Sequence, residues 1–192
     1  AEQLLKDAQN QDVVILHGCC HNPTGANLSL NQWRVLSEIF KEKRVLPLID
    51  LAYQGFGDGL TEDTEGLRKM MSEVPEAMVA VSCSKNFGVY RDRVGVAIAM
   101  SENQNQKLVA LDNLKSFNRL TFSFPPDHGA AVVNQILKDE SLKKLWSEEL
   151  EKMRVHMLSL RKNLAQSLAK ETNSDRFNFV ERHRGMFSKL GL

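Results

Sequence analysis

Short apolar runs recur through the first half of the chain and alternate with amphipathic stretches. Runs without a polar residue at every second position are typical of strands buried on both faces of a parallel sheet. The stretches between them have the three- and four-residue spacing of surface helices. The predicted strands are 13–16, 45–50, 77–82 and 94–100, and the predicted helices are 29–42, 62–73 and 102–117. This alternation predicts an α/β fold, with a mostly parallel sheet flanked by helices.

The pattern changes after Pro125 and Pro126. Apolar residues then recur at helical spacing from Leu142 to Leu168, which predicts one long amphipathic helix that bridges two domains. Residues 177–180 predict a return to a strand. We expect residues 1–8 to be the tail of a helix, and the whole sequence to be a piece of a longer chain, because it begins without Met.

Polar side chains follow three of the predicted strands directly. The carboxyl ends of parallel strands meet at one edge of a sheet, where α/β proteins bind their ligands. We therefore expect these side chains to form one site. They are His21, Asn22, Asp50, Tyr53, Ser82 and Lys85.

Composition and charge remove several classes of function. Lysine and arginine number 25 and aspartate and glutamate 24, which gives a net charge of +1 and argues against a nucleic-acid partner. No apolar run reaches the ~20 residues that a membrane helix needs, so we expect no membrane partner. The three cysteines favour a reducing, cytoplasmic location. Cys19, Cys20 and His21 lack the spacing of a zinc site, and we expect no metal.

Two of the strand-end residues suggest a particular cofactor. Lys85 directly follows a buried strand among small polar residues, and desolvation there makes a neutral amine available for a Schiff base. Asp50 ends an apolar strand, and a carboxylate in such a place needs a cationic partner. A protonated pyridine nitrogen is such a partner.

Four more residues complete the set. Arg93 has the fork geometry that suits a phosphate, and Ser82 adds a hydroxyl group. Tyr53 and Asn22 can hydrogen-bond a phenolic oxygen. Together with the lysine and the carboxylate, these groups match pyridoxal phosphate.

Each signal alone has a plainer interpretation. The lysine is then solvated, Asp50 is a turn former, residues 21–25 are a tight loop, and the leucine and methionine stripe is packing. No Gly-x-Gly-x-x-Gly follows any strand, which disfavours a nucleotide-binding oxidoreductase. The occurrence of all the signals in order, each at a strand end, favours the functional interpretation.

Five motifs in order make the sequence resemble the class I aminotransferases, within them the aspartate and aromatic amino acid group. The resemblance runs through nearly the whole chain. It implies the fold-type I transferase architecture, with residues 1–150 as the C-terminal part of the large cofactor-binding domain and 151–192 as part of a small α+β domain. The motifs are His21–Gly25, Asp50–Phe56, Ser82–Gly88, Pro125–Ala130 and Gly185–Ser188.

The resemblance also implies roles at the cofactor. Lys85 forms an aldimine with pyridoxal phosphate and moves a proton between the substrate α-carbon and the cofactor. Asp50 keeps the pyridine nitrogen protonated, and Tyr53 hydrogen-bonds the ring oxygen. Asn22 shares that hydrogen bond, while the phosphate is bound by the residues proposed above, Ser82 and Arg93.

Further implied roles concern the substrate. Asn22 also lies near the substrate α-carboxylate, and Phe187 lines the substrate entrance. Arg119 reaches into the neighbouring subunit's site and binds the side-chain carboxylate of aspartate or glutamate. His17 steadies Asp50 from behind. The implied partners are amino-acid and 2-oxo-acid substrates, and a second copy in a homodimer with shared active sites.

We therefore expect transamination between aspartate or an aromatic amino acid and a 2-oxo acid such as 2-oxoglutarate, with ping-pong kinetics. Phe124 stands where the family commonly has asparagine, so we expect no strict preference for aspartate. The family's glycine-rich phosphate loop and its α-carboxylate arginine have no counterpart in these residues, so we expect the 192 residues alone to be inactive. The alternatives are a truncated or degenerate relative without turnover, and another reaction of the same cofactor on this scaffold.

Overall fold

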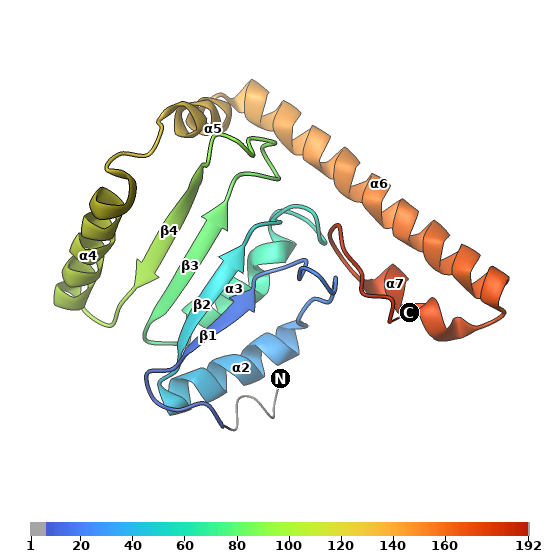
Figure 1. Cartoon of the computed structure of the whole chain (residues 1–192), viewed down its shortest axis with the longest axis horizontal. Helices are drawn as coiled ribbons and strands as arrows, with labels where there is room; N and C mark the ends of the chain where they lie inside the picture. Colours follow the sequence, from blue (N-terminus) through green and yellow to red (C-terminus); the bar gives the residue numbers. More distant parts are fainter. Residues whose placement is uncertain (1–6, 192) are drawn as a thin grey trace.

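The computed structural model describes residues 7–191 and contains one four-stranded sheet in the order β1-β2-β3-β4 (Figure 1). The strands are β1 (Val13–His17), β2 (Leu46–Leu51), β3 (Ala77–Ser82) and β4 (Gly95–Met100). The first three strands are parallel, and β4 runs antiparallel to β3. The four predicted strands and the mostly parallel sheet are thus confirmed.

Helices account for most of the rest of the chain. They are α2 (Leu30–Lys43), α3 (Glu65–Met71), α4 (Gln104–Phe122), α5 (His128–Lys138), α6 (Glu140–Thr172) and α7 (Phe179–Arg182), with short 3-10 helices η1 (Glu62–Thr64) and η2 (Asp175–Phe177). The predicted helix at 29–42 is confirmed as α2, and a capping box defines its start, because Ser29 and Gln32 each accept a hydrogen bond from the other's backbone N–H. The long helix is also confirmed, as α6 with 33 residues.

The predicted strand at 177–180 is wrong. This segment forms the end of η2 and the start of α7, which pack against α6. Phe177 and Val180 are both buried, and their three-residue spacing is that of one helical face. The helical tail expected at residues 1–8 lies largely outside the described residues. The helix α6 continues without a break through residue 150, where the domain boundary is expected. That boundary stays a prediction.

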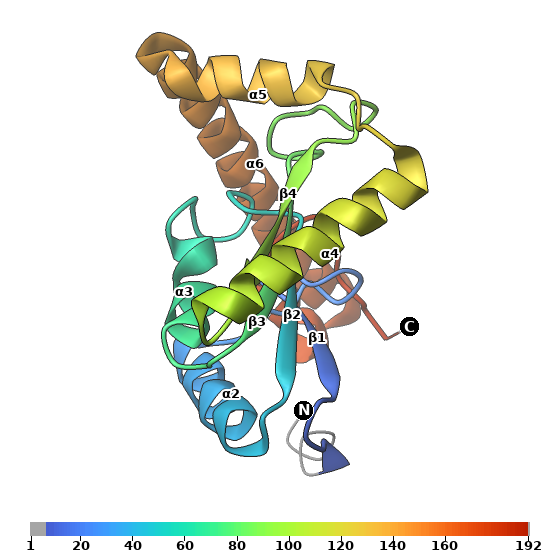
Figure 2. The ribbon, with the colours of Figure 1, turned by 90° about the vertical axis from the view of Figure 1, so that its left-hand side faces the viewer.

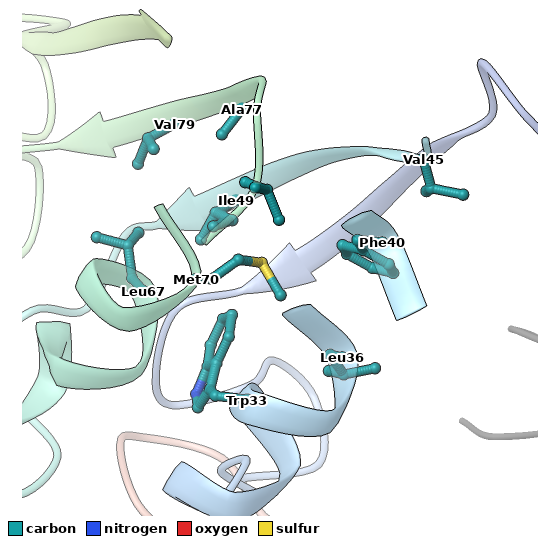
Figure 3. Close-up of a cluster of buried hydrophobic side chains, with 10 residues drawn as sticks. Trp33, Leu36, Phe40, Val45, Ile49, Leu67, Met70, Ala77 and Val79 are labelled. Carbon is teal, nitrogen blue, oxygen red and sulfur yellow. The ribbon is translucent and has the colours of Figure 1, made fainter. Parts of the chain in front are cut away.

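One face of the sheet carries the main core. Helices α2 and α3 lie together on that face (Figure 2), and their apolar side chains pack against the inward residues of the strands (Figure 3). The cluster comprises Trp33, Leu36, Phe40, Val45, Ile49, Leu67, Met70, Val74, Ala77 and Val79. On the opposite face of the sheet, the β1 side chains Val13 and Ile15 are 54% and 66% exposed. We call this the open face, because no helix among residues 7–191 covers these side chains.

A second, smaller cluster joins α6 to the carboxyl ends of the strands. Leu150 of α6 is 1% exposed and packs with Leu51, Tyr53 and Phe56. Cys19 and Cys20, in the loop after β1, belong to the same cluster. All three cysteines of the chain are free thiols. Among residues 7–191, no helix has an apolar stretch long enough to cross a membrane.

Candidate active site

The ends of β1, β2 and β3 bring three predicted site residues to one face of the sheet. His17 and Asp50 are direct partners in the register of β1 and β2. Asp50 is paired with Ala80 on β3, and Ser82 lies two residues further along on the same face. This is the open face, opposite Ile49 and the helix-covered core. The shared face of Asp50 and Ser82 agrees with the strand-end rule, and His17 lies beside Asp50, next to which the family resemblance places it.

Tyr53 lies in the loop after β2 and connects two further predicted residues. Its side chain is buried, and its ring lies under the Lys85 ammonium group, with Nζ 4.7 Å from the ring centroid. The Phe187 ring meets the Tyr53 ring edge-on, with centroids 6.4 Å apart at 81°. The Tyr53 ring thus contacts both Lys85 and Phe187, although the three residues come from distant parts of the sequence.

The neighbours of His17 select its tautomer and lower its pKa. Its Nδ1 accepts the backbone N–H of Asn22 at 3.2 Å, so the ring hydrogen of the neutral form lies on Nε2. Burial, and then the His21 ring at 4.4 Å, lower the pKa of His17 below the ordinary histidine value, while Asp50 partly offsets this shift. A neutral His17 with a free Nε2–H is suited to donate a hydrogen bond on the Asp50 side.

Ser82 is the last residue of β3, and the loop from β3 to β4 that follows it carries Lys85 and Arg93. The Ser82 hydroxyl accepts the backbone N–H of Ser84 at 3.2 Å, and the Cys83 N–H donates to the Val94 carbonyl at 3.0 Å. These bonds bring the start and the end of the loop together. Arg93 is exposed, has a positive φ of 52°, and donates from one guanidinium nitrogen to the Tyr90 carbonyl.

Arg119 is not brought to the other predicted residues. It lies exposed near the end of α4, donates to the Ser123 hydroxyl at 2.6 Å, and has its guanidinium 5.1 Å from the Phe124 ring centroid. Among residues 7–191 it contacts none of the other predicted site residues through a hydrogen bond, ion pair or ring.

Asp63 is a structural residue of the site that the sequence reasoning missed. Its buried carboxylate accepts the backbone N–H groups of Gly55, Gly57 and Asp58 at 2.8, 2.9 and 2.8 Å and so shapes the loop after Tyr53. The signal in the sequence is the pair of loop glycines followed by an acidic residue at the start of a helix.

The same carboxylate lies beside the Cys19 and Cys20 thiols, and the ligand-type atoms of the three residues lie within 4.8 Å of one another. Hydrogen bonding to Cys20, and then burial, raise the pKa of the Cys19 thiol far above its ordinary value. Because a metal binds the thiolate and the Asp63 oxygens are already occupied by backbone donors, the chemistry of this cluster is that of a packed core.

Trp146 was also missed, since its place in the leucine-rich stripe suggested packing alone. Its indole Nε1 donates to the Asn86 carbonyl at 2.7 Å, and its ring stacks on Phe87 with centroids 4.4 Å apart. Asn86 directly follows Lys85 and is itself buried. The helix α6 therefore fixes the loop that carries the lysine.

Two charged groups at this edge, Asp50 and Lys85, lack an ion-pair partner of opposite charge among residues 7–191. No donor of residues 7–191 hydrogen-bonds the half-buried Asp50 carboxylate, and no carboxylate there pairs with the Lys85 ammonium group. Partly buried charges of opposite sign that lack internal partners are suited to a bound molecule that carries complementary groups. The arrangement can hold a ring between a carboxylate, an amine and a phenol.

Comparison with known proteins agrees with this chemistry. The family model for aminotransferases of class I and II matches residues 1–192. An aromatic-amino-acid aminotransferase of Paracoccus denitrificans is 51% identical over 187 residues, which are 97% of this chain and 48% of that protein. The aspartate aminotransferase of Escherichia coli K12 is 43% identical over 188 residues, which are 98% of this chain and 48% of that protein.

Solved structures give the same result. A structure of an aromatic amino acid aminotransferase with 3-indolepropionic acid superposes with a TM-score of 0.97 at 50% identity, covering all of this chain and 49% of the other. The Burkholderia pseudomallei aromatic-amino-acid aminotransferase, covalently bound to pyridoxal phosphate, superposes with a TM-score of 0.95 at 34% identity, covering 100% and 48% of the two chains. The chain thus spans about half the length of the relatives it matches.

Proposed function

The chain belongs to the class I and II aminotransferases, and from this premise we propose that the protein containing it is a pyridoxal-phosphate-dependent aminotransferase. It transfers the amino group of aspartate or an aromatic amino acid to a 2-oxo acid such as 2-oxoglutarate. The observation that carries the proposal is the set of unpartnered groups at the strand ends, with the Lys85 ammonium group over the Tyr53 ring and the Asp50 carboxylate on the open face of the neighbouring strand.

The residues of this edge fit the cofactor group by group. Lys85 would hold the aldehyde carbon and carry the proton to and from the substrate. The Asp50 carboxylate, with His17 beside it in the register, would keep the ring nitrogen cationic. When bound, pyridoxal phosphate supplies an aldehyde that takes the amino group and a ring that takes up electrons.

The remaining residues would orient what is bound. Tyr53 is fixed by burial and would donate its hydroxyl hydrogen to the ring oxygen, with Asn22 at its other side. Ser82 and Arg93, at the two ends of one loop, would bind the phosphate. Phe187 stands at the edge of the Tyr53 ring, where it would limit the space for the substrate and exclude water.

The helix α4 supports a homodimer. None of its side chains is buried, and several large apolar ones are more than half exposed, among them Val109, Phe117 and Leu120 at 62%, 64% and 78%. An apolar helix face of this kind is typical of a subunit interface. Arg119 lies on this helix, away from its own site, as is required of a residue that serves the partner's site. The free thiols of all three cysteines support a cytoplasmic location.

The test is a transamination assay on the full-length protein. Aspartate, phenylalanine and tyrosine are offered separately with 2-oxoglutarate, and glutamate formation is followed with the protein preloaded with pyridoxal phosphate. We expect glutamate with at least one donor and none above background after Lys85→Ala. A cofactor-loaded protein that forms no glutamate with any donor contradicts the proposal and points to the degenerate relative or to another reaction of the cofactor.

A further inference from the structure

Arg161 of α6 is a buried cation whose hydrogen-bond acceptors are backbone carbonyls and one hydroxyl group. Its side chain is 8% exposed, and no carboxylate among residues 7–191 forms an ion pair with it. The guanidinium donates to the Gly185 carbonyl from two nitrogens at 3.0 and 2.5 Å, to the Phe187 carbonyl at 2.6 Å, and to the Ser188 hydroxyl at 2.5 Å. One side chain thus binds the backbone on both sides of Met186.

These acceptors belong to one segment, residues 184–188, which we call the strap. The strap passes between α6 and the loop after β1 (Figure 1). On that side, the Arg184 N–H donates to the Gly25 carbonyl at 2.8 Å, and the Arg184 guanidinium pairs with Asp58 at 2.7 Å. The strap is therefore bonded to α6 on one side, and to Gly25 and Asp58 on the other.

Contact between the strap and the loop is close enough to require glycine. A Cβ on Gly185 would lie 2.5 Å from the Cys20 Cβ, and Gly185 also has a positive φ of 75°. A Cβ on Gly25 would collide with the Phe187 carbonyl oxygen. A small displacement of the strap towards the loop is therefore resisted by hard contacts, and on the α6 side Arg161 holds the strap through its hydrogen bonds.

The strap carries one residue of the candidate active site, Phe187. Phe187 lies two residues after Gly185, the residue in close contact with Cys20. Its ring meets the Tyr53 ring, and the Lys85 amine lies over that same ring. We propose that Arg161 is a positioning residue for the aminotransferase reaction, which holds Phe187 against Tyr53 and so sets the fit of the amino donor. This inference rests on the proposed function and adds to it a residue that contacts neither substrate nor cofactor.

Lysine cannot replace this arginine. The ammonium group has three donors at one point, whereas the guanidinium reaches its acceptors with a rigid planar fork. Arg161→Lys keeps the charge but leaves buried strap carbonyls without a donor, so that the strap and Phe187 shift relative to Tyr53. Lys162→Met is the matched control, because Lys162 is the next residue on the same helix and is exposed.

The experiment measures kcat and KM of the full-length, cofactor-loaded protein with the amino donor that the unmodified protein prefers. We expect Arg161→Lys to raise KM on the order of tenfold, the effect of losing one hydrogen bond to a charged group, and to change kcat less than about twofold. Lys162→Met leaves both values unchanged. An unchanged KM in Arg161→Lys, or a fall in kcat without a rise in KM, overturns the proposal.

A double-mutant cycle separates positioning from general destabilisation. In a Phe187→Ala background, Arg161→Lys should raise KM by less than about twofold, because the side chain that it positions is gone. A full tenfold rise in that background overturns the proposal. If Arg161→Lys does not fold, Ser188→Ala removes one of its acceptors and must raise KM in the same direction, and an unchanged KM there also overturns it. The two proposals fail in different ways. If the unmodified protein transfers no amino group, the proposed function is wrong; if it does and the Arg161 variants behave as the controls do, only the positioning role is wrong.

Discussion

Asp63→Asn tests how the loop beside Tyr53 is held. The Asp63 side chain is 6% exposed, and its two oxygens accept three backbone N–H groups, from Gly55 and Gly57 at Oδ2 and from Asp58 at Oδ1. An asparagine offers one oxygen and one NH2 group, so that at least one N–H group loses its acceptor and faces a donor. The loss of one charge-assisted bond, with a buried donor left unpaired, costs about 2–4 kcal/mol of unfolding free energy.

The assay combines urea unfolding of the full-length protein with hydrogen exchange of the backbone amides of residues 55–58. We expect the free energy of unfolding to fall by the amount given above and the Gly55 and Gly57 amides to exchange at least about tenfold faster. Glu65→Gln, an exposed acidic residue in the next helix, serves as the control and should change stability by no more than about 0.5 kcal/mol. Equal results for Asp63→Asn and this control would refute the reasoning.

Leu150→Ala truncates a side chain that is 1% exposed and should lower the free energy of unfolding in urea by about 2–5 kcal/mol, whereas Leu145→Ala, at a side chain 56% exposed, should change it by no more than about 0.5 kcal/mol. Ser29→Ala removes the capping oxygen of α2 and should cost about 1 kcal/mol in the same assay, with Ser29→Asp restoring most of it. Burial, and then Arg161, lower the pKa of His183, so the folded protein binds this proton less well than the unfolded chain. Stability should therefore fall as pH drops through about 6.5 and below, and His183→Gln should show a smaller fall; an equal fall in this variant would contradict the assignment.

Local rules were sufficient for much of the fold and part of the site. The strands follow from apolar runs, and the start of α2 follows from the Ser29 capping box. The shared face of Asp50 and Ser82 follows from the rule that parallel strands end at one edge, whereas His17 is implied by the family resemblance alone. These features depend on residues close together in sequence or on chain direction alone. The antiparallel direction of β4 does not, because an apolar run has the same pattern in either direction.

The features that sequence reasoning missed depend on partners far apart in the chain. The Trp146 indole binds the Asn86 carbonyl across 60 residues, and the Arg184 guanidinium pairs with Asp58 across 126. Arg161 is one charged residue among many on a long amphipathic helix, and only its burial under the strap distinguishes it. The segment at 177–180 predicts a strand from its apolar residues Phe177, Phe179 and Val180, and its packing against the distant helix α6 decides for a helical turn instead.

The most direct test of the central claim is to reduce the full-length, cofactor-loaded protein with borohydride and to map the modified peptide by mass spectrometry. A pyridoxal phosphate adduct on Lys85, absent after Lys85→Ala, is the predicted result, because this amine lies over the Tyr53 ring at the edge of the sheet that carries Asp50. An adduct on another lysine of the unmodified protein, or an undiminished adduct in Lys85→Ala, would contradict it.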